Sequence, residues 1–506
     1  MRLSVLALLL ACGCSNYKQS APEVAPPGGS GAAAVENAPA PRVKQEVSKQ
    51  PLPALATETG GATGKPMWQY GFGGNGIDVP RGVTTDANND VYVVGYFDGE
   101  IDFGPPVGVR KPAGGSDGYV TKLTSEGKLA WAQTFGAKRD DDAKGVAARG
   151  DRIVVVGNFL DEIKLGEFSH KAVGSDDLFA FALDKTGQPQ WLWTLGGIDS
   201  DGANAVAASP DGGWIIGGSY SQSITIGSTV LKSKGKTDAI LIKLAASGDL
   251  QWIKSFGGAY DDTILRVAVD ANANIYVAGH FADTSDWGGT PLKAHGGSDN
   301  DIVLAKYDTN GDHVWSKNFG NMFNDVAGGL AVDPAGNITL VGSFENKGPI
   351  SFGPGDEHNS LGEADAYIAR FTTDGKLEWA HTFGAERPDV AWGVATDAAG
   401  NTVTTGWFEK TVDFGKGAIA SKGNKDIFAV KLDAKGNVVW VNTFGDHDHD
   451  QGRGVALDDK GNAIVVGAFR FKLDLVKPVI ESKRPENDPV LSKAPKPDVA
   501  VVKFAR

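Results

Sequence analysis

The sequence predicts an all-β fold: a seven-bladed β-propeller of four-stranded blades, closed by pairing of strands from the two ends of the chain. A Trp-x-x-x-Phe/Leu motif occurs seven times, with successive tryptophans 60 to 64 residues apart. Each copy is followed by a Gly-x-(Phe/Tyr) motif and then by an Asp-led apolar run. A period this regular indicates one supersecondary unit per copy. The tryptophans are Trp68, Trp131, Trp191, Trp252, Trp315, Trp379 and Trp440.

Each unit contains four strand-like segments, which we letter A to D from the expected axis outward. Residues 267–269 and 275–278 are apolar runs typical of strands that are buried on both faces, and they represent strands A and B. Residues 238–244 are an Asp-led strand C, and residues 252–256 mix polar with apolar side chains, as an outermost strand D does. Short turns such as Asp-Pro-Ala-Gly-Asn at 333–337 join A to B.

The ends of the chain indicate a closed ring. The repeats begin with a lone strand D at 68–72 and end with a lone strand C at 498–504. We expect the first strand to complete the last blade, because a ring of sheets hides edges that would otherwise be exposed. Strand A begins with a small residue in six copies, as expected near a crowded axis, and Arg266 is the exception. The small residues are Gly82, Gly145, Ala205, Gly329, Gly393 and Gly454.

The order of these motifs resembles the SBBP-type β-propeller repeat family of bacterial surface and secreted proteins. Strand C follows a pattern like Asp-Ala-Phe-Val-Ala-Lys-Leu, and strand B a pattern like Gly-Asn-x-Tyr-Val-x-Gly. The resemblance covers residues 67–506 and implies the propeller fold. It implies no common catalytic residues.

The composition is that of an acidic globular protein. Of the 506 residues, 41% are hydrophobic and 22% are charged, which is ordinary for a packed domain. The net charge is -13, whereas a nucleic-acid-binding protein needs a basic face, so we expect no nucleic-acid partner. The two cysteines both lie near the start of the chain, so the propeller must be held together by packing without disulfides.

Residues 1–14 predict a lipoprotein-type signal peptide. Arg2 precedes the apolar run 3–11, which is too short to span a bilayer, and Leu-Leu-Ala-Cys at 9–12 resembles a bacterial lipobox. We expect Cys12 to carry the lipid that anchors the protein in the bacterial cell envelope, with Cys14 as the second candidate. Gly13 rather than Asp after Cys12 resembles outer-membrane sorting. The alternative is a soluble secreted protein that has lost its leader.

A predicted tether precedes the propeller at 67–506, and one irregular loop lies within it. Residues 15–66 are rich in Pro, Ala, Gly and Ser and predict a disordered tether with an average reach on the order of 40 Å. Residues 475–497 connect strands B and C of the last blade and carry several Lys, Arg and Pro residues. We interpret this segment as a solvated insertion, with a contact arm for a partner as the alternative.

An aspartate lies six residues after the end of each strand D motif, in the D-to-A connection. Turn capping within each blade is the favoured interpretation, because it needs one aspartate per blade and explains the sevenfold repetition. The alternative is a ring of carboxylates that binds Ca²⁺, and otherwise we expect no cofactor. The aspartates are Asp78, Asp141, Asp201, Asp262, Asp325, Asp389 and Asp450.

The segment Asp446, His447, Asp448, His449 and Asp450 is the densest in metal-ligating side chains. Alternation in an extended segment would place the two imidazoles on one side and the three carboxylates on the other. Two histidines can begin a Zn²⁺ or Cu²⁺ site, but a closed zinc site needs four ligands. A solvated polar loop is the favoured interpretation, and a metal site is the alternative.

The position nine residues after the end of strand D differs among the copies, unlike scaffold positions. Closure of the ring would place Trp392, Arg453, Arg81 and Lys144 on four consecutive blades, with Trp407 and His280 at the ends of their B strands. The favoured interpretation is that the side chains at this position pair with the aspartates three residues earlier, as exposed ions often do. The sharper hypothesis is that these six residues form a basic and aromatic ligand-binding sector. The seven copies read Arg81, Lys144, Asn204, Leu265, Gly328, Trp392 and Arg453.

We therefore expect a membrane-anchored envelope lipoprotein whose monomeric propeller is a non-catalytic binding or scaffold module. Its site is expected on the face that carries the D-to-A and B-to-C loops, here called the loop face, with a protein or polysaccharide as partner. The alternative is a propeller lyase or hydrolase that acts on a polysaccharide or an ester. Clustered histidines or acids with shifted pKa values would favour the enzyme.

Overall fold

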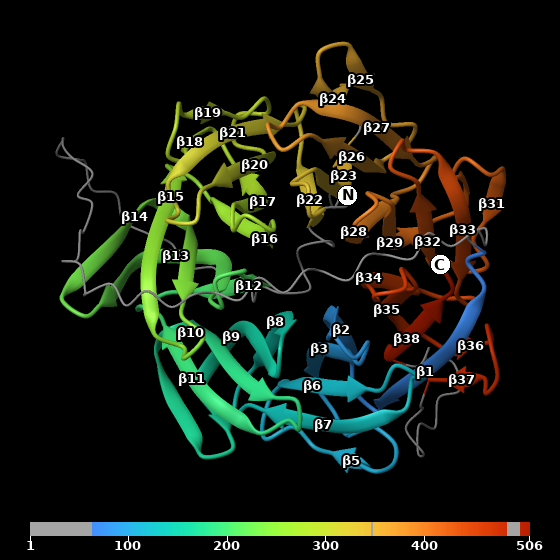
Figure 1. The fold of residues 1–506 in the computed structure, drawn as a ribbon, viewed down its shortest axis with the longest axis horizontal. Coiled ribbons are helices and arrows are strands. Elements are labelled where there is room, and N and C mark those ends of the chain that lie inside the picture. Colours follow the sequence, from blue (N-terminus) through green and yellow to red (C-terminus); the bar gives the residue numbers. More distant parts are fainter. Residues whose placement is uncertain (1–62, 346–347, 483–495) are drawn as a thin grey trace, which may run out of the picture. The chain divides into compact units, whose positions relative to one another are not determined.

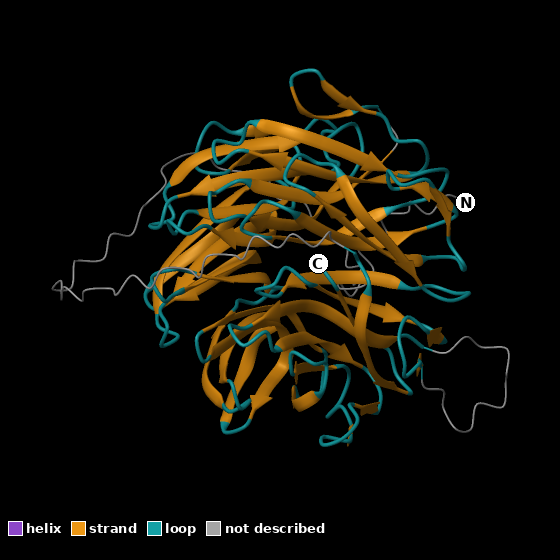
Figure 2. Ribbon diagram, turned by 45° about the vertical axis from the view of Figure 1, so that its right-hand side comes forward, coloured by secondary structure: helices purple, strands orange, loops and turns teal. Residues whose placement is uncertain are grey.

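The computed structural model describes residues 63–345, 348–482 and 496–506. Every regular element in these ranges is a β-strand (Figure 2), and they contain no helix that is long and apolar enough to cross a membrane. The predicted signal peptide, Cys12 and the tether up to residue 62 lie outside the described residues. The central part of the 475–497 insertion, residues 483–495, also lies outside them.

Seven blades of four strands each are arranged radially, as the sequence predicts (Figure 1), and the sheets of blades 3 and 7 are extended to six strands by a hairpin of the next blade. Within each sheet the strands run A, B, C, D outward from the axis, and neighbours are antiparallel. The A strands of blades 1 to 7 are β2 (Asp78–Thr85), β8 (Asp141–Arg149), β12 (Gly202–Ala208), β16 (Thr263–Val269), β22 (Asp325–Val332), β28 (Val390–Thr396) and β34 (Gln451–Leu457). The B strands are β3 (Val91–Phe97), β9 (Arg152–Leu165), β13 (Trp214–Ile226), β17 (Ile275–Phe281), β23 (Ile338–Glu345), β29 (Thr402–Phe408) and β35 (Ala463–Phe469).

Strands C are buried where they pass through the blades, whereas strands D keep several half-exposed side chains. The C strands are β6 (Asp117–Leu123), β10 (Phe168–Asp184), β14 (Thr229–Leu244), β20 (Asp301–Tyr307), β26 (Ala364–Phe371), β32 (Asp426–Leu432) and β38 (Asp498–Phe504). The D strands are β7 (Leu129–Phe135), β11 (Pro189–Leu195), β15 (Leu250–Gly258), β21 (His313–Phe319), β27 (Leu377–Phe383), β33 (Val438–Phe444) and, for blade 7, β1 (Pro66–Gly74).

The B-to-C connections differ among the blades. In blades 2 and 3 strands B and C continue beyond the sheet as one long hairpin. The other five blades carry a short hairpin in this connection, and the hairpins of blades 1 and 4 pair with strand D of the preceding blade. These hairpins are β4 (Ile101–Asp102) with β5 (Val109–Arg110), β18 (Thr284–Asp286) with β19 (Leu292–Lys293), β24 (Ile350–Gly353) with β25 (Asp356–His358), β30 (Thr411–Asp413) with β31 (Ala418–Ala420), and β36 (Lys472–Leu473) with β37 (Ile480–Glu481).

The hydrophobic core lies between the blades. The described residues form seven buried apolar clusters, and each draws its members from two neighbouring blades. Val154 and Leu178 of blade 2, for example, share a cluster with Trp214 and Ile240 of blade 3. Each sheet is therefore covered on both faces, which is why strands B and C carry continuous apolar runs.

The two ends of the chain close the ring. Strand β1 pairs antiparallel with β38, with Trp68 opposite Lys503 and Phe72 opposite Val499. The first strand of the propeller is therefore strand D of blade 7, and the innermost strands of blades 7 and 1 contact each other. The predicted closure is confirmed.

The ends also reproduce the turn that joins strands C and D in the other blades. The N–H of Thr63 donates to the carbonyl of Arg506, and the N–H of Ala505 donates to the carbonyl of Lys65, both at 2.8 Å. Gly64, at a φ of 60°, takes the place of the turn glycine. Residues 63–65, which we expected in the tether, therefore take part in the closure.

The strand D tryptophans lie at the junctions between blades. Nε1 of Trp68 donates to the carbonyl of Ser125 in the C-to-D turn of blade 1 at 3.1 Å, and four more of these tryptophans make the same bond to their next blade. A Cβ on Gly127 of that turn would lie 2.5 Å from the Trp68 ring. Most of these rings are half-buried, and Trp440 alone among the seven is fully buried.

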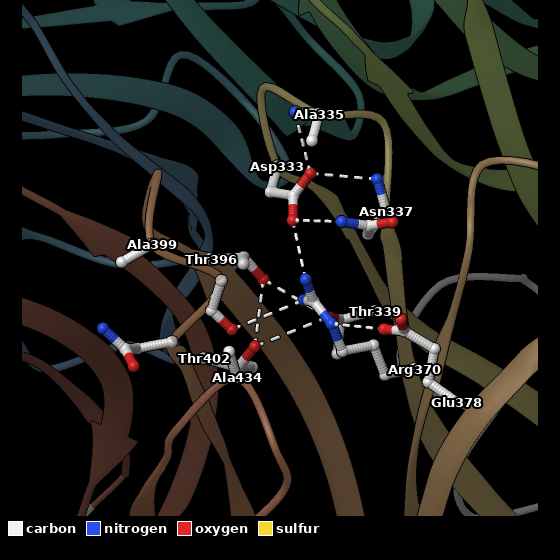
Figure 3. A network of polar contacts seen from close by, with 12 residues as sticks. Asp333, Ala335, Asn337, Thr339, Arg370, Glu378, Thr396, Ala399, Thr402 and Ala434 are labelled. Atoms are coloured by element: carbon white, nitrogen blue, oxygen red, sulfur yellow. Dashed lines mark hydrogen bonds and ion pairs between the residues drawn. The ribbon is translucent and has the colours of Figure 1, made fainter.

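At the end opposite the loop face, buried cations on strand C hold the A-to-B turns (Figure 3). In blade 5, Nη2 of Arg370 lies 2.6 Å from Oδ2 of Asp333, whose Oδ1 accepts the backbone N–H of Asn337. In blade 7, Lys503 lies 2.8 Å from Asp458 in the same arrangement. This end of the ring therefore consists of repeated scaffold contacts.

Replacement of Trp68 by Ala should destabilise the ring at its closure. The half-buried ring and its hydrogen bond predict a cost of about 2 kcal/mol, below the roughly 3 to 5 kcal/mol of a fully buried tryptophan. Denaturant unfolding measures this cost. Met67→Ala is the matched control, because Met67 is 50% exposed in the same strand and should change stability by less than about 0.5 kcal/mol. Equal stability of the two variants would contradict the closure contact.

Candidate ligand-binding site

The seven aspartates that follow strand D are buried in the junctions between blades, with exposed fractions of 0 or 1%. Each accepts the backbone N–H of the residue four positions earlier, as Asp78 does from Gly74 at 2.8 Å. The other six do so at 2.6 to 3.0 Å. This is the geometry of the predicted turn cap. Within the described residues no three acidic, histidine or cysteine side chains form a group that could hold a metal ion.

Each capping aspartate has a second buried carboxyl beside it, from strand C of the preceding blade. A Cβ on Gly445 would lie 2.8 Å from Oδ2 of Asp450 and 2.9 Å from Cγ of Asp426. Any side chain at this position would clash with the two carboxyl groups, so the residue that follows strand D must be glycine. The sequence shows both aspartates, but their pairing was missed because they lie on different blades. The strand C partners are Asp498, Asp117, Asp177, Asp238, Asp301, Asp365 and Asp426.

The environment of these pairs favours the protonated acids. Burial, followed by the neighbouring charge of Asp117, raises the pKa of Asp141 to about 8. Burial likewise raises the pKa of Asp389 to about 8, and the pKa of Asp450 to about 7. A raised pKa favours the neutral form of these carboxyls and so lessens the repulsion between the two members of a pair.

The variable position nine residues after strand D is a β-bulge in every blade. The register between strands A and B shifts at this residue in all seven sheets, so it has no partner on strand B. A bulge re-aims its side chain while the ladder continues on either side. The side chain at this position is therefore free to vary without loss of the sheet. We call the seven residues, Arg81, Lys144, Asn204, Leu265, Gly328, Trp392 and Arg453, the bulge ring.

Ring closure brings the predicted basic residues onto adjacent blades. Arg81 on blade 1 contacts Asp142 of blade 2, with Nη2 at 3.0 Å and Nε at 3.2 Å from Oδ2. Its guanidinium also lies 5.1 Å from the centre of the Tyr96 ring. Nζ of Lys144 on blade 2 reaches over Gly202 of blade 3, 3.6 Å from the place of a Cβ. These side chains lean toward the following blade.

Blades 6 and 7 place two cations over two tryptophans. Cζ of Arg453 lies 5.8 Å from the centre of the Trp392 ring, and Nζ of Lys425 lies 3.4 Å from the centre of the Trp407 ring. Trp407 is 1% exposed, so its ring supports Lys425 and offers no free stacking face. Lys425 lies 3.8 Å from Glu409. Burial lowers the pKa of Lys425 to about 8, opposed by Glu409 and assisted by Arg453.

His280 lies outside the four consecutive blades of the sector. It is on strand B of blade 4, opposite Thr263. Burial lowers the pKa of His280 to about 4, so the imidazole is neutral at pH 7. His280 therefore adds no positive charge to the loop face.

The side chains of Asp446 to Asp450 point to different partners. Asp450 is the buried turn cap, and Nδ1 of His447 lies 2.9 Å from Oδ1 of Asp446. Asp448 contacts Nη1 of Arg470 at 3.3 Å. The three carboxylates do not converge, in contrast to the predicted alternation. The metal hypothesis stays a prediction, and these described residues supply no donor set for it.

Two cations of the loop face were missed by sequence reasoning. Lys425 is the last residue of a variable B-to-C connection, and only the tertiary structure places it on Trp407. Arg266 was visible as the one large residue at a position that is otherwise Gly or Ala, and that exception was the available signal.

Comparison with known protein families finds no family model that matches the chain. It is 23% identical over 405 residues to an uncharacterized WD repeat-containing protein of Acanthamoeba polyphaga mimivirus, covering 65% of this chain and 29% of that protein. It is 27% identical over 205 residues to the regulatory protein FlaEY of Caulobacter vibrioides, covering 39% of this chain and 21% of that protein. The chain thus spans less than a third of the length of these relatives.

Two solved structures are similar to this chain at low identity. The Neurospora crassa Pan2 WD40 domain matches at a TM-score of 0.43 and 7% identity, over 85% of this chain and 89% of that one. Sqt1 from Chaetomium thermophilum matches at 0.39 and 14% identity, over 80% of this chain and 97% of that one. The strand pairing described above establishes the β-propeller fold without these likenesses.

The raised pKa of the capping aspartates predicts a stability that falls as pH rises. Asp141 binds its proton more tightly in the folded state, so its contribution is greatest below its ordinary pKa and is lost as pH rises from about 4 to about 8. Asp141→Asn should flatten this dependence and stabilise the protein at pH 8 relative to wild type. Denaturant unfolding at pH 4, 6 and 8 measures the free energy of unfolding. Asp151→Asn is the control, because the Asp151 carboxylate is exposed. Parallel profiles for Asp141→Asn and wild type would contradict the prediction.

Proposed function

We propose that the protein is a non-catalytic binding or scaffold module of a bacterial envelope, which takes its ligand on the loop face at the bulge ring. The observation that carries this proposal is that the seven blades differ at a bulge, where a side chain can change without cost to the sheet. The variable residues include Arg81, Lys144 and Arg453, which closure brings onto adjacent blades. A basic, partly aromatic surface of this kind suits binding.

The described acids and histidines of the loop face support binding over catalysis. The carboxyls with raised pKa values are bonded to backbone N–H groups inside the junctions, where each has a structural role. A Gly-x-Ser-x-Gly pattern at 114–118 lies in a B-to-C loop, and Oγ of its Ser116 bonds Asp140 at 3.1 Å. A hydrolase would instead need a histidine beside the serine. The acids with raised pKa values are a feature that a lyase or hydrolase would also need, but their bonds to backbone N–H groups favour the structural role.

The anchoring part of the proposal is supported by the sequence. The lipobox-like segment that ends at Cys12 and the Pro-rich tether would hold the propeller outside a membrane, and the outer membrane is the favoured site. Two lipid signals are needed for stable anchoring, which a diacylated lipoprotein cysteine provides. We propose a monomeric propeller with a protein or polysaccharide partner.

Removal of two loop-face arginines should weaken ligand binding while the propeller stays folded. Arg81→Ala with Arg453→Ala removes two donor forks, of which Arg81 pairs with Asp142 and Arg453 contacts Gln451 and the Trp392 ring. Thermal unfolding checks that the variant is folded. Envelope glycans, acidic polysaccharides and envelope protein extracts are screened against wild type and this variant. Lys128→Ala with Lys376→Ala is the matched control, because it removes two exposed lysines from C-to-D turns at the opposite end. Equal binding of every ligand by all three proteins would overturn the proposed site.

Cys12→Ala should release the protein from the membrane fraction and leave the propeller folded. The lipid is the only anchor that the sequence predicts. Fractionation of cells with a high-salt wash measures release, and a circular dichroism spectrum typical of strands checks the fold. Cys14→Ala is the control and should remain in the membrane fraction. A Cys12→Ala protein that stays in the washed membranes would contradict this anchor.

A further inference from the structure

The B-to-C hairpin of blade 3 carries positive charge without any acidic residue. It comprises residues 221–237, the parts of β13 and β14 that continue beyond the sheet, and Figure 1 shows β14 standing out from the side of the ring. Its charged residues are Lys232, Lys234 and Lys236. The whole chain has a net charge of -13, so these lysines form a local excess of the opposite sign. Such an excess selects an acidic partner.

The three lysines lie on one face of the hairpin. Alternate residues of a strand point to the same face, and the exposed positions of this part of β14 are Val230, Lys232, Lys234 and Lys236, with half-buried residues between them. Successive lysines are therefore about 6.8 Å apart along the strand. Val230 begins the row and is 52% exposed. The face presents an evenly spaced row of cations next to one apolar side chain.

The charges of this row are only loosely paired within the chain. Nζ of Lys234 lies 3.2 Å from Oδ2 of Asp286, and Nζ of Lys236 lies 4.0 Å from Oδ2 of Asp261. All four side chains are about half exposed or more, and ion pairs of this kind stabilise a fold little. Among the residues that the structure describes, no carboxylate lies within 4.0 Å of Nζ of Lys232. The ammonium groups are therefore available to an outside partner.

The same stretch of β14 has an open backbone edge. On one side, residues 229–232 pair with β13. On the other side, β15 pairs with β14 only from Ala239 onward, and the one bridge before that is at Thr237. No described strand therefore pairs with the outer side of 229–236. An edge of this kind presents N–H and C=O groups to which a further strand can bond.

The turn of the hairpin decides which groups face that edge. Residues 226 and 229 flank a two-residue turn, so they form a hydrogen-bonded pair, and bonded and non-bonded pairs then alternate along the hairpin. Val230 and Lys232 belong to the non-bonded pairs, and their N–H and C=O groups point to the open edge. The residues with exposed side chains are thus the residues whose backbone faces outward.

We propose that the edge of β14 at 229–233 binds an extended acidic segment of a partner protein, which adds to the hairpin as a further strand. Backbone hydrogen bonds to Val230 and Lys232 align the segment. Acidic side chains at alternate positions of the segment then lie opposite Lys232 and Lys234, as cross-strand pairs of opposite charge. This surface includes no residue of the bulge ring, so the inference goes beyond the ligand site proposed above and is independent of it.

Lysines at an open edge also oppose a wrong pairing. Two copies of this hairpin would bring their lysine rows together, and like charges directly opposite one another are destabilising. The row therefore disfavours edge-to-edge association of the protein with itself and favours an acidic strand. The long hairpin of blade 2 differs in this respect, because Nζ of Lys164 lies 3.0 Å from Oε2 of Glu162 within the same hairpin.

The test measures binding of two fluorescent peptides to the full-length protein by anisotropy. One peptide alternates threonine and glutamate, so that every glutamate falls on one face of a strand. The other has the same composition with the glutamates in one block. We expect the alternating peptide to bind about fivefold more tightly, and Lys232→Glu with Lys234→Glu to weaken it about tenfold. A peptide that alternates threonine and lysine should bind this variant more tightly than wild type.

Lys164→Glu with Lys171→Glu is the matched control, because it makes the same change of charge at two exposed lysines of the blade 2 hairpin. It should leave the affinity of the alternating peptide within about twofold of wild type. Circular dichroism checks that both double variants are folded.

A second arm tests the backbone contacts. Two forms of the alternating peptide are N-methylated, one at every threonine and the other at every glutamate. Only one form should lose binding, because the N–H groups of alternate residues face β14 in an added strand. Equal loss in both forms, or no loss in either, overturns the inference.

Three further outcomes overturn it. They are equal affinity of wild type for the alternating and the blocked peptide, equal affinity of wild type and the charge-reversed variant for the alternating peptide, and absence of binding by wild type. Binding of oligogalacturonate that is lost in the charge-reversed variant, without binding of the alternating peptide, assigns the lysine row to an acidic polysaccharide and also overturns it. The Arg81 and Arg453 double variant tests the bulge ring separately, so the two failures are distinguishable.

Discussion

The packing of the three inner strands of one blade against the innermost strand of the next is the interaction on which the ring depends. At the loop face, the aspartate that begins strand A accepts an N–H from the connection that leaves the previous strand D, as Asp78 does from Gly74. At the opposite end, a strand D tryptophan such as Trp68 bonds the next blade's C-to-D turn. Seven such junctions, each with its own apolar cluster, hold the propeller without disulfides.

These junctions explain why the side chains can vary among the blades at only a few positions. The buried pair Asp117 and Asp141 repeats around the ring with its glycine and its backbone donors, and a change at any member would disturb a junction. The bulge residue lies a few positions further along strand A and has no ladder partner. Variation there leaves the junction intact, which is why Arg81, Trp392 and Arg453 can differ where the scaffold cannot.

The loop face mixes buried acids with cations. Burial raises the pKa of Asp141 and so favours its protonated form. Arg81 and Lys425 are each paired with a carboxylate, and the ring faces of Trp407 and Trp392 support Lys425 and Arg453. These contacts hold the cations in place on the face where we propose that the ligand binds.

The sequence by itself determined the blade count, the strand order, the closure by 68–72 and the position of the capping aspartates. It could do so because these features repeat, so that seven copies reveal one local rule. It also marked Arg266 and the bulge ring as exceptions to that rule. Only the tertiary structure decided which side chains meet: Asp117 with Asp141, Lys425 with Trp407, and Arg266 with Gly328. Each of these contacts joins segments of the chain brought together by the packing of strands and blades, and no local spacing encodes how closely those segments approach.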